Sequence, residues 1–180
     1  MLDRRFLEMR RTETSHAWNP AAITVLRTVT ITMSAASVHL IPKCAIWMRR
    51  KMTVSDTPRV LVVDDYADTA DAISMVLAIC GFDAHAVYGG RPAIDATARW
   101  EPDVVLLDIW MPDMSGLEVA ARLRADENTS GIILIAHSAA ASESDMQRAK
   151  RAGFDAFCVK PMDATTFAPL LRHFLAGPVG

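Results

Sequence analysis

Five stretches typical of strands recur in the second two-thirds of the chain, and segments interpreted as helices separate them. Four are apolar runs, at residues 60–63, 104–107, 132–136 and 156–159, and the fifth, at residues 83–88, is half-polar. The runs at 60–63 and 104–107 are continuously apolar, which is typical of strands buried on both faces of a sheet. Helices are predicted over residues 67–80, 92–99, 117–125, 142–152 and 164–175. This alternation of strand and helix, repeated five times, predicts an α/β fold with a parallel sheet and helices on both faces.

Polar side chains stand at the ends of four of the five predicted strands. In chain order they are Asp64 and Asp65, Asp108, Ser138 and Lys160. The carboxyl ends of parallel strands lie at one edge of the sheet, where open α/β sheets bind ligands. Each residue alone is explained as an exposed strand end, but together they predict one site at that edge.

These residue types indicate phosphoryl transfer to a carboxylate. Three carboxylates at one site repel one another at neutral pH and need a compensating cation. Oxygen ligands of this kind suit Mg²⁺, which keeps several waters and often bridges to phosphate. Lys160 adds a positive charge and Ser138 a hydroxyl donor, so the metal and the lysine would neutralise charge on a group transferred to an aspartate.

Composition narrows the possible classes of function. Apolar residues make up 51% of the 180 residues, which is enough for one globular domain with a core. The net charge of −2 gives no indication of nucleic-acid binding. Cys44, Cys80 and Cys158 are widely spaced and lack metal-ligand spacing. They favour buried thiols in a reducing cytosol over a disulfide framework.

The first 57 residues differ in composition from the rest of the chain. Their most apolar stretch, residues 28–41, is too short to predict a membrane span. We expect residues 1–57 to be an N-terminal extension that is either poorly ordered or a start-site artefact, with Met52 as the alternative start. The basic run 49–51 is interpreted as a solvated linker, with contact to anionic lipid or nucleic acid as the alternative.

Residues 58–176 resemble the receiver domain of bacterial two-component response regulators, of the single-domain type that includes chemotaxis regulators. The motifs that carry the resemblance are Asp64-Asp65, the stretch Leu-Asp-Ile-Trp-Met-Pro-Asp-Met-Ser-Gly around Asp108, Ser138, and Lys160-Pro161. The separations between Asp108, Ser138 and Lys160 also agree with the family. The resemblance implies a flavodoxin-like, doubly wound, five-stranded parallel sheet with strand order 2-1-3-4-5. Residues 177–180 would be a tail.

The resemblance implies a phosphoacceptor and a metal site. Asp108 would accept the phosphoryl group. Asp64, Asp65 and Asp108 would hold Mg²⁺, with the backbone carbonyl of Trp110 as a further ligand.

The resemblance also implies a set of switch residues. Ser138 would contact the phosphoryl group, Lys160 would pair with it, and Phe157 matches the aromatic residue whose rotamer follows the hydroxyl group. Ser138 stands where threonine is commoner, which keeps the hydroxyl and loses a methyl group. His137 is polar where an apolar residue is usual. It is interpreted as a hydrogen-bonded strand-end residue, with metal binding or proton transfer as the alternative.

The function implied is a phosphorylatable switch that is no enzyme beyond its own phosphotransfer and dephosphorylation. One alternative is an unphosphorylated receiver-like interaction module, which would not need the complete residue set. Another is a Mg²⁺-dependent phosphohydrolase with an aspartyl nucleophile, which usually has a second acid where Trp110 stands. Trp110 and Ala140 would flank the path of the hydrolytic water, and neither carries a group that activates water, so a long-lived phosphorylated state is expected.

The implied partners are a sensor histidine kinase or phosphotransfer protein and a downstream protein target. No DNA-binding domain is recognised after residue 175, so we expect the output to pass through protein docking on the face formed by residues 142–175. A cytoplasmic location without a membrane span is expected.

Overall fold

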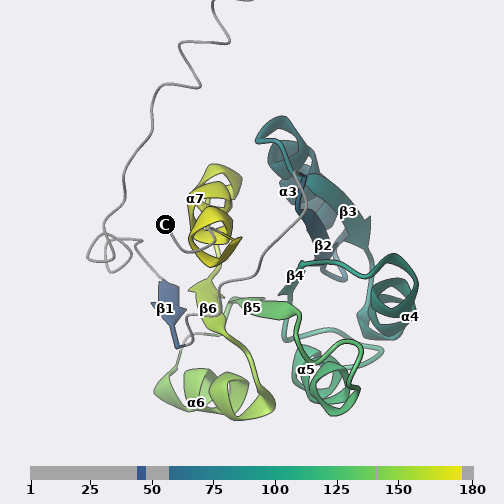
Figure 1. Ribbon diagram of the computed structural model, residues 1–180. Coiled ribbons are helices and arrows are strands. Elements are labelled where there is room, and N and C mark those ends of the chain that lie inside the picture. The colour runs from purple at the N-terminus through teal and green to yellow at the C-terminus, as the bar shows by residue number, and fades with distance from the viewer. Residues whose placement is uncertain (1–43, 48–56, 141, 176–180) are drawn as a thin grey trace, which may run out of the picture. The chain divides into compact units, whose positions relative to one another are not determined.

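The computed structural model describes residues 44–47, 57–140 and 142–175, and within them helices flank a six-stranded sheet (Figure 1). The order across the sheet is β1-β6-β5-β4-β2-β3. Strands β2 to β6 are parallel to their neighbours, whereas β1 runs antiparallel to β6. The strands are β1 (Cys44–Ile46), β2 (Arg59–Val63), β3 (Asp83–Val87), β4 (Val104–Leu107), β5 (Ile133–Ser138) and β6 (Ala156–Val159).

The five parallel strands confirm the predicted fold class and strand order. Numbered from β2 onward, the sequence β3-β2-β4-β5-β6 is the expected order 2-1-3-4-5. Every residue of β4 and β5 is buried, as their continuous apolar runs require. No residue of β3 is fully buried, because this half-polar strand lies at the edge of the sheet.

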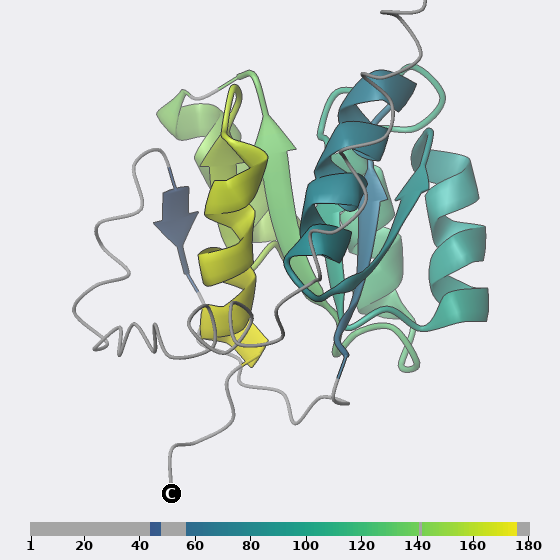
Figure 2. The ribbon, with the colours of Figure 1, turned by 90° about the horizontal axis from the view of Figure 1, so that it is seen from above.

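Helices cover both faces of the sheet, as predicted (Figures 1 and 2). One face packs against α3 (Ala67–Ile79) and α7 (Ala164–Leu175). The other packs against α4 (Gly90–Trp100), α5 (Gly116–Ala125) and α6 (Glu143–Ala152). Alternate residues of each central strand enter opposite cores, since side chains alternate along a strand. The sheet is thereby fixed from both sides, and its strand ends are held in register.

The strand β1 corrects the expected number of five strands. It lies within the segment that the sequence analysis assigns to an extension outside the sheet, and it pairs antiparallel with β6. Its three residues are half-buried, and so short a stretch has no periodicity from which a strand could be predicted. By pairing with β6, β1 covers backbone groups that an edge strand would otherwise leave unpaired.

Some expectations lie outside the described residues. These are the order of residues 1–43 and 48–56, the alternative start at Met52, and the tail 177–180. Among the residues that the structure describes, no helix is long and apolar enough to cross a membrane.

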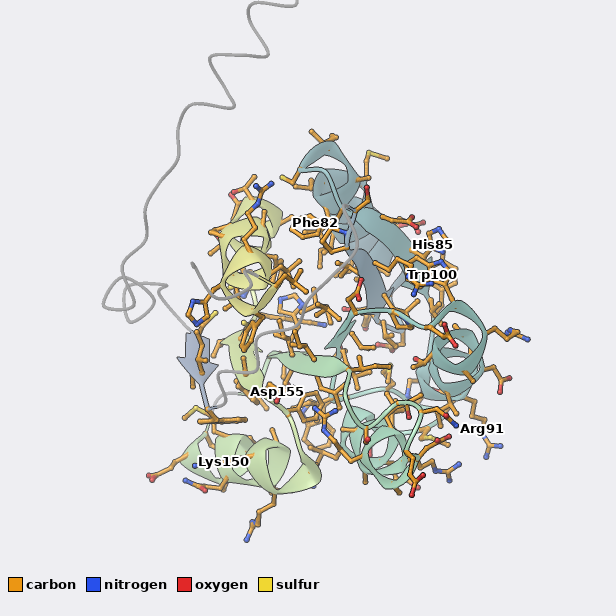
Figure 3. All side chains as sticks on the ribbon, in the orientation of Figure 1. Phe82, His85, Arg91, Trp100, Lys150 and Asp155 are labelled. Carbon is orange, nitrogen blue, oxygen red and sulfur yellow. The ribbon has the colours of Figure 1, made fainter. Side chains whose placement is uncertain are left out.

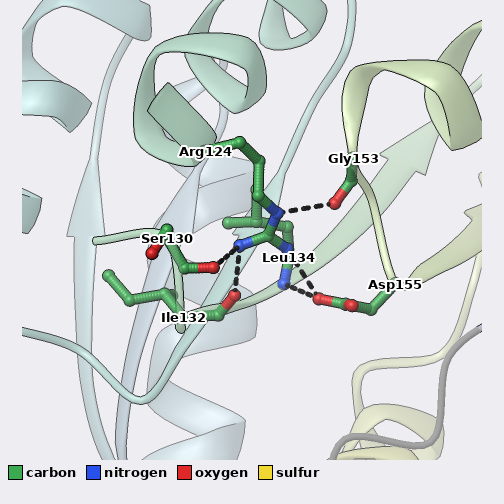
Figure 4. A network of polar contacts seen from close by, with 6 residues as sticks. All are labelled: Arg124, Ser130, Ile132, Leu134, Gly153 and Asp155. Carbon is green, nitrogen blue, oxygen red and sulfur yellow. Dashed lines mark hydrogen bonds and ion pairs between the residues drawn. The ribbon is translucent and has the colours of Figure 1, made fainter. Parts of the chain in front are cut away.

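A buried ion pair ties α5 to β5 and β6 at the amino ends of these strands (Figure 4). The guanidinium of Arg124 donates to Asp155 Oδ2 at 2.8 Å and to backbone carbonyls of Ser130, Ile132 and Gly153. The same carboxylate oxygen accepts the N–H of Leu134 at 2.9 Å. Because the Asp155 side chain is fully buried, removal of either charged partner would leave an uncompensated group.

Polar side chains gather outside the two cores, as around the exposed edge strand β3 (Figure 3). There the ring of His85 stacks on the indole of Trp100 with centroids 4.1 Å apart. Arg59 also donates to the carbonyl of Trp100, the last residue of α4. These contacts fix the end of α4 against β2 and β3.

Candidate functional site

Asp64 and Asp108 each stand one residue beyond a buried strand. The N–H of Asp64 donates to Val87 O at 3.2 Å, and the N–H of Asp108 donates to Val63 O at 2.9 Å, so the ladder bonding continues through both residues. Asp64 is only 2% exposed and Asp108 only 6% exposed. The sheet therefore holds two carboxylates at its carboxyl edge, nearly out of solvent.

Lys160 joins these two carboxylates. Its Nζ lies 2.7 Å from Asp64 Oδ2 and 2.6 Å from Asp108 Oδ2. The remaining oxygens accept backbone N–H groups, Asp64 Oδ1 from Tyr66 at 3.0 Å and Asp108 Oδ1 from Trp110 at 3.1 Å. Both carboxylates are thus oriented by one ammonium group and by the loops that follow their strands.

The pKa values follow from this burial and pairing. Burial raises the pKa of Asp108, and the hydrogen bond from Lys160 offsets only part of that effect. For Lys160, burial disfavours the charged form, but the hydrogen bonds to Asp108 and Asp64 outweigh it and raise its pKa. The site consequently keeps a charged ammonium beside a carboxylate that is more basic than an exposed one.

Asp65 completes a cluster of three carboxylates. One oxygen from each of Asp64, Asp65 and Asp108 lies within 4.8 Å of the others. Asp65 Oδ1 is buried and has no hydrogen-bond partner among the described residues. A buried carboxylate oxygen without a partner is costly, so this atom is available to a cation.

Ser138 and His137 end the neighbouring strand β5 as buried polar residues. Ser138 is fully buried, and its Oγ has no hydrogen-bond partner within the described part of the chain. Its backbone carbonyl accepts the N–H of Lys160 at 2.9 Å, which places the hydroxyl residue next to the lysine strand end. His137 borders a cavity of about 450 Å³ that Lys160 also lines. Its ring meets Phe167 edge-on at 5.0 Å.

Burial lowers the pKa of His137 to about 4, and the positive charge of Lys160 contributes in the same direction. At neutral pH the imidazole is therefore uncharged. His137 Nε2 has no hydrogen-bond partner in the described ranges.

The two aromatic residues singled out in the sequence lie in different environments. The side chain of Trp110 is exposed, with 56% of the residue accessible, so the indole is not packed into the core. Phe157 on β6 is buried, and its ring lies 6.4 Å from that of Trp47, which follows β1. The contact with Trp47 could not be foreseen, because the segment before residue 58 carries no signal that it joins the sheet.

Two residues between β4 and the first turn of α5 make contacts that the sequence analysis did not predict, although Gly116 there indicates a turn before a helix. A Cβ atom on Gly116 would overlap the carbonyl oxygen of Asp108, so only glycine permits this close approach. The carboxylate of Asp113 accepts the N–H groups of Gly90 at 3.0 Å and Arg91 at 2.8 Å, at the start of α4. Chiefly through the bond from Arg91, these contacts lower the pKa of Asp113. In the sequence, these contacts could have been inferred only from the presence of Asp113 and Gly116 in the stretch Met-Pro-Asp-Met-Ser-Gly.

The structure thus brings the strand-end groups of the sequence analysis to one edge. Asp64, Asp65, Asp108 and Lys160 form one charged cluster, and Ser138 adjoins it through its backbone. The arrangement offers hard oxygen ligands, a fixed cation and an unpartnered hydroxyl around one buried carboxylate. These are the groups required to bind and receive a phosphoryl group.

Comparison with known proteins supports this interpretation. A family model described as the response regulator receiver domain matches residues 60–172, which is more than half of the chain. The chain belongs to this family. It is a receiver domain of the kind found in two-component signalling, and its fold is the flavodoxin-like fold expected from the sequence.

Relatives of two architectures are similar to this receiver domain. The DNA-binding response regulator MtrA of Mycobacterium tuberculosis is 37% identical over 103 residues, which cover 57% of this chain and 44% of MtrA. The chain therefore spans less than half the length of that relative. The polar-differentiation response regulator DivK of Brucella ovis is 29% identical over 119 residues, which cover 66% of this chain and 97% of DivK.

Among solved structures, the chemotaxis response regulator CheY4 of Vibrio cholerae superposes with a TM-score of 0.63 at 25% identity. The match covers 66% of this chain and 99% of CheY4.

Proposed function

We propose that this receiver domain, comprising residues 58–176, accepts a phosphoryl group on Asp108 from the phosphohistidine of a sensor histidine kinase or phosphotransfer protein. The observation that carries the proposal is the bridging of Asp108 and Asp64 by Lys160 at the carboxyl edge of the sheet. A carboxylate oxygen of Asp108 would attack phosphorus as the bond to the imidazole breaks.

The donor set fits a magnesium ion. Asp64, Asp65 and Asp108 present oxygens within 4.8 Å of one another, and one oxygen of Asp65 is buried without a partner among the described residues. Hard oxygen donors of this kind are the ligands that Mg²⁺ takes. We propose that these carboxylates hold the ion together with the backbone carbonyl of Trp110. When bound, Mg²⁺ would neutralise negative charge on the carboxylates and on phosphoryl oxygens.

Three further residues would convert phosphorylation into a signal. Lys160 would pair with the phosphoryl group, because that group introduces new negative charge beside an ammonium that already contacts Asp108. Ser138 would donate its hydroxyl proton to a phosphoryl oxygen, since Ser138 Oγ has no partner within the described chain. Phe157, on the strand beside Ser138, would change rotamer as the serine moves.

The output would pass through protein docking rather than through a reaction. We propose that a downstream protein recognises the face that residues 142–175 form, which comprises α6, β6 and α7. The domain would catalyse only its own phosphotransfer and dephosphorylation, in the cytoplasm.

Replacement of the phosphoacceptor tests the proposal. The Asp108→Asn variant should lose acid-labile, Mg²⁺-dependent labelling by acetyl phosphate, because an amide is no nucleophile toward phosphorus. Asp103→Asn is the matched control, since Asp103 lies just before β4 and accepts the N–H of Arg59 through one oxygen. It should label as the wild type does. Equal labelling of both variants would place the acceptor elsewhere, and a wild type without labelling would favour an unphosphorylated interaction module.

A further inference from the structure

Two cysteines face each other across the strands β1 and β6. Cys44 and Cys158 are direct partners in the antiparallel register, and their sulfur atoms lie 2.8 Å apart. Opposite residues in antiparallel strands have Cα atoms about 4.5–5.5 Å apart, within the range of about 4.4–6.8 Å that disulfides span. A bond between the two sulfurs would therefore need no movement of the backbone.

The two thiols are chemically unequal. Cys44 is half-buried, whereas Cys158 is fully buried in the core. The S–H of Cys158 stabilises the thiolate of Cys44 and lowers its pKa more than burial raises it. The same bond, together with burial, raises the pKa of Cys158. Since the thiolate is the nucleophilic form, Cys44 is the attacking residue and Cys158 the resolving one.

One member of the pair belongs to β6, which is part of the proposed docking face formed by residues 142–175. Cys158 lies on β6 between Phe157 and the strand end that precedes Lys160. Trp47, the residue after β1, packs toward Phe157 of β6. In the reduced protein, β1 is held against β6 by the strand pairing, by this packing and by the hydrogen bond from Trp47 N–H to Asp155 O at 2.9 Å. Cys44 Sγ also contacts Cys158 Sγ at 2.8 Å and donates to Met162 Sδ at 3.4 Å. None of these contacts is covalent. A disulfide between Cys44 and Cys158 would fix both the pairing of β1 with β6 and the packing of Trp47 on Phe157.

We propose that Cys44 and Cys158 are a peroxide-responsive thiol pair whose disulfide locks β1 onto the edge of β6. The Cys44 thiolate attacks one oxygen of hydrogen peroxide, so that an S–O bond forms, the O–O bond breaks and hydroxide leaves as water after taking a proton. Cys158 then loses its proton, and its sulfur attacks Cys44, so that the S–S bond forms, the S–O bond breaks and a second water leaves. Two thiols are oxidised and one peroxide is reduced.

The test oxidises the full chain with hydrogen peroxide and maps the product by mass spectrometry. The expected product is a monomer lighter by two hydrogen atoms, in which the Cys44 and Cys158 peptides are linked and which dithiothreitol reverses. The Cys80→Ser variant is the matched control and should form the same link, because Cys80 lies at the end of α3 and outside the pair. A link through Cys80, a link between chains, or survival of both thiols would overturn the proposal.

Two variants assign the roles of the thiols. Cys158→Ala should trap Cys44 as a sulfenic acid that dimedone labels, whereas Cys44→Ser should leave Cys158 unlabelled because it is buried. The opposite pattern would overturn the assignment. The wild-type peptide map alone decides whether the disulfide between Cys44 and Cys158 forms. The proposal therefore stays testable if either variant fails to fold.

Hydrogen exchange tests the lock itself. Amide hydrogens of residues 44–47 should exchange at least about tenfold more slowly in the disulfide form, because opening of β1 is then restricted. Unchanged exchange in fully linked protein would refute the lock. The Asp108→Asn variant should give the same results, so failure of the thiol chemistry is distinguishable from failure of the phosphorylation proposal.

Discussion

Lys160 and Asp108 are 52 residues apart in the sequence, yet Lys160 Nζ lies 2.6 Å from Asp108 Oδ2. The same ammonium group also contacts Asp64, so one positive charge is shared by two buried carboxylates. Asp65 takes no part in this bridge, and its Oδ1 has no partner among the described residues. Lys160 therefore neutralises charge on Asp64 and Asp108, whereas no described residue pairs with Oδ1 of Asp65.

Replacement of Asp65 should separate metal binding from stability. We expect Asp65→Ala to weaken Mg²⁺ binding strongly, because the variant loses one of three carboxylate ligands. Without metal it should be as stable as the wild type or more stable by about 1 kcal/mol, because an unpartnered buried oxygen is removed. Thermal unfolding with and without Mg²⁺ measures both effects, since a ligand that binds only the folded state raises its stability.

Asp155, at the opposite end of the sheet, provides the control for the Asp65 variant. Asp155→Ala should lower the free energy of unfolding by about 3 kcal/mol, because it leaves the guanidinium of Arg124 without its buried partner. Its Mg²⁺-dependent stabilisation should equal that of the wild type. If Asp65→Ala instead loses metal-free stability and keeps its response to Mg²⁺, the three carboxylates do not form the metal site.

His137 makes stability depend on pH. Its pKa is lowered from 6.5 to about 4 in the folded protein, so between these values the unfolded chain binds more protons than the folded one. The stabilisation is complete above about pH 6.5 and is lost as pH falls toward 4. Between about pH 7 and pH 5, the wild type should lose about 2 kcal/mol through this residue.

Urea unfolding at the two pH values measures this loss. The His137→Leu variant should lose about 2 kcal/mol less than the wild type on acidification, because it has no imidazole to protonate. Replacement of the exposed His85 by glutamine is the matched control and should keep the wild-type difference. A pH dependence that is the same in His137→Leu and the wild type would show that His137 is not buried in its neutral form.

The sequence carries enough information for the sheet and most of the site, for a specific physical reason. Buried parallel strands appear as apolar runs, and the carboxyl ends of such strands meet at one edge. The convergence of Asp64, Asp108 and Lys160 therefore follows from the strand assignments alone.

Contacts between residues far apart in the sequence leave no such signal. The bonds from Gly90 and Arg91 to Asp113 join the start of α4 to the loop after β4, and the pairing of Cys44 with Cys158 joins two strands whose residues are 114 positions apart. Neither contact is accompanied by a periodic pattern of apolar residues from which it could be predicted. The strand β1 is missed for the same reason, because three half-buried residues resemble any short loop.

A chain that begins at Met52 tests what β1 contributes. The sequence alone predicts that this truncated chain folds and labels as well as the full one. Because truncation uncovers the edge of β6 and removes Trp47 from Phe157, we now expect a loss of about 2 kcal/mol in unfolding free energy. Labelling by acetyl phosphate should be unchanged, since no site residue lies before residue 58. An insoluble or unlabelled truncated protein would show that the upstream residues belong to the core.

On the proposed function, the lifetime of the phosphorylated state would depend on the water that attacks phosphorus opposite Asp108. Trp110 and Ala140 stand two residues after Asp108 and Ser138, at the positions that flank this approach in the receiver family. Trp110 is 56% exposed as a residue, whereas Asp108 is 6% exposed. Slow hydrolysis would therefore arise from the lack of a side chain that orients or activates water rather than from cover by the indole.

Substitution at both positions should shorten that lifetime. The variant Trp110→Asn with Ala140→Glu should lose phosphate at least about tenfold faster than the wild type, which corresponds to about 1.4 kcal/mol of barrier. Trp110→Ala is the matched control, because it removes the indole without adding a polar group, and it should change the decay by less than about twofold. Loss of label from purified phosphoprotein measures all three rates. Fast decay of the wild type, or acceleration by Trp110→Ala alone, would show that the missing polar groups do not set the lifetime.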